Sequence, residues 1–257
     1  MPLTAPNSQK AADALNQLWN SVRRHLDASD FRLLQIARLG KALLRSDAAA
    51  GYSVLSAVAT LSGDVDLMRD YADKAARLRR DPGTMINDSS MLGNLGFFSE
   101  AGRIFRQALS VDRLPQREIG EDAIANGSIL AIDDALTMAG NMPTAVPPPL
   151  RKAIAVAAVI LRRNNVSDDD VGSWLDKAGD LMRENKVFFI EHPRLFATLE
   201  EDFAQIDLSY ALDIDSVCAA ELNRELVERC FDARVAPPEC FSFGFNSCLR
   251  LHDGLAA

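Results

Sequence analysis

The sequence predicts a mainly α-helical fold, in which helical hairpins stack as a solenoid and continue into a helical C-terminal part with a small β-hairpin. Three observations predict it. Apolar residues recur at helical spacing, as in Tyr52, Leu55 and Ala59. Related residues recur every 33 positions in the first half of the chain. Glycine and proline residues, which are typical of turns and helix ends, recur with the same period.

The composition is that of an ordinary globular protein, with 257 residues, 48% hydrophobic residues and a formal charge of -8. It excludes disordered and collagen-like chains. The longest strongly apolar run, residues 153–161, is much shorter than the ~20 residues of a membrane-spanning helix. The N-terminus lacks the pattern of a secretory signal, so we expect a cytoplasmic protein that does not bind membranes. In that compartment Cys218, Cys230, Cys240 and Cys248 are expected to be thiols.

The 33-residue period is carried by several columns of related residues. It defines three units, Asn16–Ala48, Ala49–Asp81 and Pro82–Leu114, and a degenerate fourth over residues 115–141. Together with the N-terminal residues they form the first predicted region, 1–141, and a proline-rich segment separates it from a helical region, 142–257. The columns are Trp19, Tyr52 and Met85; Leu39, Ala72 and Phe105; and Ala42, Ala75 and Ala108.

A fourth column marks the turn inside each hairpin. Gly63 and Gly96 are expected to leave the first helix with positive φ, and Asp30 occupies the same column in the first unit. Gly127 would join the two helices of the fourth unit. One hairpin cannot bury both of its faces, so neighbouring units must stack to form a stable core.

The pattern resembles the tetratricopeptide (TPR) repeat family over residues 16–114. Trp19 and Tyr52 match its aromatic column, Ser56 and Ser89 its small eighth position, and Ala101, Phe105 and Ala108 its second-helix signature. The chain departs from the family in its period, which is one residue short, and in Asp88, which occupies an apolar position.

The resemblance implies a concave groove, lined by the first helices of successive units, that binds a partner helix or an extended peptide. We therefore predict a protein–protein interaction module: an adaptor, scaffold or chaperone without catalytic activity, cofactor or metal. Exposed repeat ends leave a homodimer open as an alternative. The groove residues implied are Asn20, Arg24, Asp27, Ser53, Ala57, Thr60, Ile86, Ser90, Gly93 and Asn94.

In the C-terminal half, helices are predicted over residues 150–163, 195–212 and 216–232, with short strands at Val187–Ile190 and Phe241–Phe245. Ser167 followed by three aspartates predicts the N-cap and acidic first turn of a further helix, ending near Glu184. A calcium loop is the alternative, but its alternating oxygen ligands and closing glutamate are missing.

Two other function classes stay open. An enzyme or small-molecule site could form around Glu191 and His192, beside Glu200 and Glu201. No nucleophilic side chain, however, stands at a spacing from them that matches a known catalytic motif. A thiolate pair of Cys240 or Cys248 with His252 is a weaker alternative. RNA binding is disfavoured by the acidic balance and would need a basic stripe. Its members would be Arg77, Arg79, Arg80, Arg103, Arg106, Arg113 and Arg117.

Overall fold

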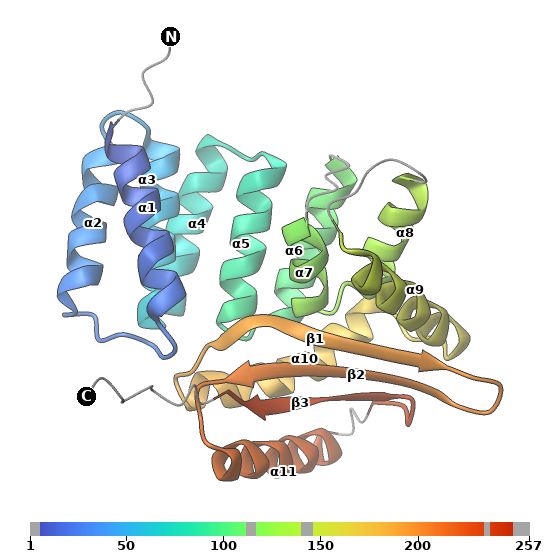
Figure 1. The fold of residues 1–257 in the computed structure, drawn as a ribbon. Coiled ribbons are helices and arrows are strands. Elements are labelled where there is room, and N and C mark those ends of the chain that lie inside the picture. The colour runs from blue at the N-terminus through green and yellow to red at the C-terminus, as the bar shows by residue number, and fades with distance from the viewer. Residues whose placement is uncertain (1–5, 112–116, 140–145, 234–236, 249–257) are drawn as a thin grey trace, which may run out of the picture.

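The computed structural model describes residues 6–111, 117–139, 146–233 and 237–248. A row of upright helices stands above a three-stranded sheet (Figure 1), which confirms the mainly α fold with a small β part. The first eight helices are α1 (Pro6–Ser21), α2 (Phe31–Leu43), α3 (Ala48–Ser62), α4 (Val65–Leu78), α5 (Pro82–Asn94), α6 (Phe98–Val111), α7 (Arg117–Ala125) and α8 (Ile129–Ala139). They are followed by α9 (Pro148–Arg163), α10 (Asp168–Glu184), β1 (Phe189–Leu199), β2 (Ala204–Leu212), α11 (Ser216–Asp232) and β3 (Phe241–Ser247).

The hairpins α3–α4 and α5–α6 coincide with the second and third predicted units. Their equivalence is visible in one contact made twice: Ser56 donates to the carbonyl of Met68 at 3.0 Å, and Ser89 donates to that of Ala101 at 2.9 Å. In both hairpins the bonded residues are twelve positions apart in the chain. The 33-residue period therefore corresponds to a repeated three-dimensional contact.

The glycine turns behave as predicted in three hairpins. Gly63, Gly96 and Gly127 have φ of 73°, 74° and 75°, the left-handed region in which a residue with a Cβ is strained. Gly96 is further constrained, because an added Cβ would lie 2.5 Å from Cα of Gly179. The turn between α5 and α6 thus sits directly against the backbone of α10.

The first unit differs from the prediction. Its first helix, α1, begins at Pro6 and ends at Ser21, well before Asp30. Asp30 has a φ of -56° and is the N-cap of α2, accepting a hydrogen bond from the amide of Arg32. The assignment of Asp30 to the positive-φ column was wrong because a carboxylate at this place satisfies a free helix N–H.

The C-terminal region contains more β structure than predicted. Residues 195–212 are not helical: they form most of an antiparallel hairpin in which Leu195 pairs with Leu208. Strand β3 then pairs in parallel with β2 after the crossover helix α11, giving the order β1-β2-β3. The sheet has three strands instead of two. Helices α9, α10 and α11 match their predicted positions within a few residues.

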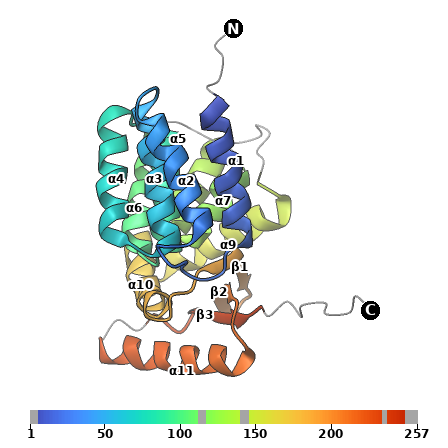
Figure 2. The same cartoon turned by 90° about the vertical axis from the view of Figure 1, so that its left-hand side faces the viewer.

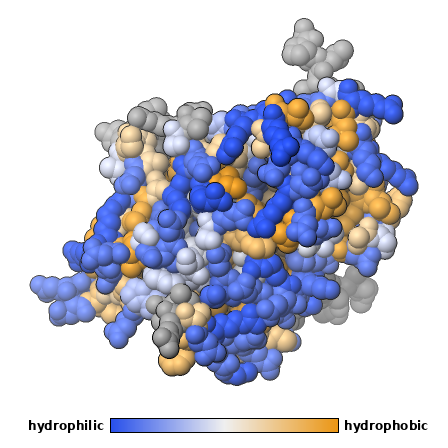
Figure 3. All heavy atoms as spheres, turned by 180° about the vertical axis from the view of Figure 1, so that it is seen from behind, coloured by the Kyte–Doolittle hydropathy of each residue, from blue (hydrophilic) through white to orange (hydrophobic). Residues whose placement is uncertain are grey.

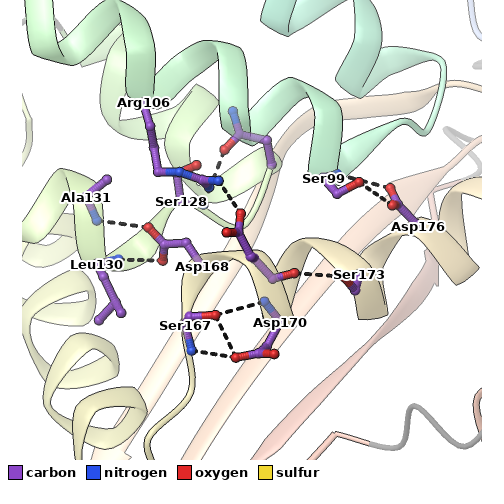
Figure 4. A network of polar contacts seen from close by, with 12 residues as sticks. Ser99, Arg106, Ser128, Leu130, Ala131, Ser167, Asp168, Asp170, Ser173 and Asp176 are labelled. Carbon is purple, nitrogen blue, oxygen red and sulfur yellow. Dashed lines mark hydrogen bonds and ion pairs between the residues drawn. The ribbon is translucent and has the colours of Figure 1, made fainter.

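Helix α10 crosses the ends of the upright helices (Figure 4). Its N-cap, Ser167, forms a capping box with Asp170, which confirms the helix start that the acidic run predicted. Asp168 accepts hydrogen bonds from the amides of Leu130 and Ala131 at 2.8 and 3.0 Å, and so caps α8. Carboxylates of α10 therefore satisfy free N–H groups on another helix of the stack.

Two hydrophobic clusters form the core. One joins α1–α6 and includes Phe188 from the segment before β1. The other joins α6–α8 to α9, α10, α11 and the sheet, from Phe98 to Phe245. The predicted boundary between 141 and 142 falls in residues outside the described part, and this second cluster unites the helices on either side of it.

The surface seen from behind mixes hydrophilic and apolar residues (Figure 3). Isolated apolar side chains such as Leu67 on α4, Leu78 on α4 and Met138 on α8 are exposed, which is ordinary for a globular protein. Among the described helices, none is long and apolar enough to cross a membrane.

Candidate functional site

The helices α1, α3, α5 and α7 line one large cavity of about 960 Å³, which β1 helps to close. Figure 2 shows α1 and α7 on the opposite side of the molecule from α4 and α6. The first helix of each hairpin thus lines the cavity. Small residues on α3, Ala50, Ser53 and Ala57, leave the space open.

Several predicted groove residues line this cavity, and others do not. Arg24 and Asp27 follow the end of α1: Arg24 forms a β-bridge with Val187, and Asp27 bonds Ser29. Thr60 is buried and donates to the carbonyl of Ser56. Ile86 is also displaced from the cavity, since it packs against the core. The predicted residues that line it are Asn20, Ser53, Ala57, Ser90, Gly93 and Asn94.

Asparagine side chains give the cavity wall its hydrogen-bonding capacity. Asn16 and Asn20 come from α1, and Asn87 from α5; all three are exposed. Within the described part of the chain, their amide groups have no hydrogen-bond partner. Each amide offers two donors and an acceptor oxygen, a set that matches the N–H and C=O groups of a peptide backbone.

Ser53, Ser90 and Asn94 of the wall already form hydrogen bonds within their own helices. Ser53 and Ser90 donate to carbonyls one turn earlier in their own helices, at 3.1 and 3.0 Å. Asn94 donates to the carbonyl of Ser90 at 2.8 Å. These residues therefore shape the wall, whereas Asn16, Asn20 and Asn87 keep free polar groups.

The lower part of the cavity is aromatic, and sequence reasoning missed it. Trp19 of α1 stacks with Phe188 at 6.2 Å between ring centroids, and Phe189 lines the same region. Phe188 is held there because its amide donates to the carbonyl of Arg23 at 3.1 Å. This pairing of chain segments far apart in sequence leaves no local signal.

His25 lies behind this floor, with its ring 4.6 Å from that of Phe188. Burial lowers the pKa of His25, and the positive charge of Lys186 lowers it further. Its Nε2 atom is buried and has no partner in the described structure. The floor is therefore backed by an imidazole whose protonation is opposed by burial and by Lys186.

An imidazole and a carboxylate meet at the edge of the cavity. Nε2 of His192 is 2.8 Å from a carboxylate oxygen of Glu121 on α7. The predicted partners do not form this contact: Glu200 and Glu201 follow the far end of β1, and the side chain of Glu191 lies outside the described part. Glu121 was missed because it comes from a separate helix.

Among the described residues, no group of His, Cys, Asp and Glu side chains could hold a metal ion. All four cysteines are free thiols. Burial raises the pKa of Cys230 and of Cys240, which opposes thiolate formation. His252, the proposed partner of a thiolate, lies outside the described residues.

The arginines of the predicted basic stripe are partly neutralised. Arg79 pairs with Asp47 at 3.2 Å, and Arg106 pairs with Asp169 of α10. Arg80 bonds the side chain of Gln107. Arg113 and the side chain of Arg117 lie outside the described part.

Comparison with protein-family models, curated proteins and solved structures found no match.

Proposed function

We propose that the chain is a TPR-like interaction module of the cytoplasm, which acts as an adaptor, scaffold or chaperone. Its ligand is an extended peptide segment, or a partner helix, bound in the cavity between α1 and α7. The single observation that carries the proposal is the set of unpaired amides of Asn16, Asn20 and Asn87 above the aromatic floor.

The two parts of the cavity suit two parts of such a ligand. The amides can bond backbone groups without reading a particular side chain, while Trp19 and Phe188 can bury one apolar side chain. Burying an apolar side chain of Leu or Phe size contributes about 2 kcal/mol. We expect bound peptides to share one bulky apolar residue and little else.

A peptide selection tests this function. Peptides are selected from a random library on the native chain, and their affinity is then measured for a variant carrying Ser53→Arg and Ser90→Arg. Both side chains line the cavity, so we expect the two arginines to fill it and to weaken binding at least tenfold. Circular dichroism establishes that the variant is folded.

The matched control carries Ser110→Arg and Thr137→Arg, which add the same side chain at exposed positions of α6 and α8. This control should bind as the native chain does. Peptides that bind both variants equally, or the absence of any selected peptide, would show that the cavity is not a peptide site.

A second candidate function rests on the Glu121–His192 pair. A carboxylate that holds an imidazole at the edge of a cavity can orient it as a general base. The function would be catalysis on, or binding of, a small molecule. If it operates, His192→Ala abolishes that activity or binding while peptide affinity stays unchanged; if the peptide function alone operates, His192→Ala has little effect on either.

A further inference from the structure

Helix α2 has an apolar stripe on the side opposite its buried face. Leu33, Ile36 and Leu43 are buried in the core, whereas Phe31 is 72% exposed and Leu34 is 44% exposed. At 100° per residue, the exposed stripe points about 175° away from the centre of the buried face. The hairpin α1–α2 stands at the end of the row (Figure 1), so α2 has no following hairpin on this side.

Helix α11 has a stripe of the same kind. Its residues Leu222, Leu226 and Cys230 are buried, while Val227 is 69% and Phe231 79% exposed. The stripe begins at Val217, which is also exposed. Val217, Val227 and Phe231 stand at offsets 0, 10 and 14, which fit alternating steps of three and four residues. This is the spacing of residues that form a seam between two helices.

The two stripes carry opposite charge. Helix α2 contains Arg32, Arg38 and Lys41 and no acidic residue. Helix α11 contains four acidic residues and two arginines. Among the described residues, Arg38 and Lys41 form no ion pair, and neither do Glu221 and Asp232 of α11. Each helix therefore presents apolar side chains beside unpaired charges that the other helix can neutralise.

The two helices cannot meet within one molecule. Helix α2 belongs to the upright row, and α11 lies below the sheet at another edge, as both views show (Figures 1 and 2). Both halves of the complementary pair are nevertheless present on every copy of the chain. An anionic membrane would suit α2 but would be repelled by the acidic flank of α11.

We propose that α2 of one copy docks on α11 of a second copy. The contact is heterologous, because two different surfaces meet, so a bound pair still offers one free α2, on one copy, and one free α11, on the other. A contact between single helices is smaller than the roughly 1,200–2,000 Å² of a stable complex. Self-association should therefore be reversible, and it should grow with protein concentration and weaken with added salt.

Sedimentation velocity over a concentration series tests the proposal with two variants. One carries Phe31→Ser and Leu34→Ser on α2; the other carries Val227→Ser and Phe231→Ser on α11. These side chains are exposed, so the substitutions should leave the fold intact, as circular dichroism will show. The native chain should form species larger than a dimer, and each variant alone should stay monomeric.

The equimolar mixture of the two variants gives the decisive result. The α2 variant retains a native α11, and the α11 variant retains a native α2, so the mixture should form a heterodimer and stop there. Met138→Ser, at an exposed position of α8, serves as the control and should associate as the native chain does. A monomeric native chain, a mixture that stays monomeric, or a single variant that still associates would each overturn the proposal.

Discussion

The hairpins α3–α6 and the C-terminal region α9–β3 are held together in different ways. In the hairpins, the defining contacts join residues close in sequence, such as Ser56 with Met68, twelve positions apart. The C-terminal region is held to the earlier helices by contacts between residues far apart: Ser99 of α6 bonds Asp176 across 77 positions, and Tyr210 bonds the carbonyl of Ala125 of α7 across 85.

This difference shows how the two regions depend on each other. A hairpin can form from its own sequence, but its ends expose free N–H and C=O groups. The C-terminal region supplies partners for these groups. Asp176 bonds the amide of Ser99 at the start of α6, and Arg183 bonds the carbonyl of Leu95 after the end of α5. The stack is therefore completed by contacts that its own period does not encode.

Substitution of Gly179 should break the junction between the two regions most strongly. A Cβ at Gly179 would lie 1.8 Å from the carbonyl oxygen of Gly96, a backbone atom that cannot move aside without displacing the turn. We expect Gly179→Val to lower the free energy of unfolding by about 3 kcal/mol or more. Urea denaturation measures this change.

Gly83 provides the matched glycine. It lies in the first turn of α5, where an added Cβ would meet only a carboxylate oxygen of Asp81 at 3.4 Å. Gly83→Ala should be neutral or stabilising by up to about 1 kcal/mol, because alanine loses less backbone entropy in a helix. If Gly179→Val is as mild as Gly83→Ala, the close contact between α10 and the α5–α6 turn is wrong.

Asp88 should make the stability of the repeat hairpins depend on pH, because it occupies a position that the repeat pattern reserves for an apolar residue. Burial raises the pKa of Asp88 to about 7, and the carboxylate of Asp73 adds to the effect. The folded state therefore holds this proton more tightly than the unfolded state does. Stability should fall as pH rises from about 4 to about 7, and stay low above that.

Asp88→Asn removes this dependence. At pH 8 we expect the variant to be more stable than the native chain by about 2 kcal/mol, half the full equivalent of the shift because the carboxyl is partly exposed. At pH 4 the two should be equally stable. Thermal unfolding at both pH values measures the difference, and equal stability at pH 8 would contradict the buried placement of Asp88.

The parts of the fold that the sequence predicted are those with local causes. The period places α3–α6 because each hairpin repeats the same packing, and Ser167 begins α10 through a capping box completed three residues later. Helix α11 spans the predicted residues because Asp215 caps it and its apolar residues keep helical spacing. Ser53 and Ser90, which the family resemblance assigns to a groove, lie in the cavity wall.

The sheet was predicted only in part, and the cavity floor was not predicted at all. Ile206, Leu208, Tyr210 and Leu212 alternate with partly exposed residues, a period of two that indicates a strand; the prediction of a helix there overlooked this signal. The floor depends on the pairing of residues 23–25 with 186–188. That pairing is fixed by the whole fold, so the sequence of either segment alone does not predict it.

The three aspartates at the start of α10 test how much the contact between the two regions contributes to stability, because each of them acts on a different part of the structure. Asp168 is buried and caps α8. Asp170 completes the capping box of its own helix, and Asp169, whose side chain is 80% exposed, pairs with Arg106. Single alanine substitutions therefore separate a contact between regions from a local cap and from a surface ion pair.

We expect Asp168→Ala to lower the free energy of unfolding by about 2 kcal/mol, because it leaves two partly buried N–H groups of α8 unsatisfied. Asp170→Ala should cost about 1 kcal/mol. Asp169→Ala should cost less than about 0.5 kcal/mol, because water screens an exposed pair. Denaturant unfolding of the three variants measures the order. If Asp170→Ala were the most damaging, α10 would be stabilised mainly by its own cap, and its role in completing the stack would be lost.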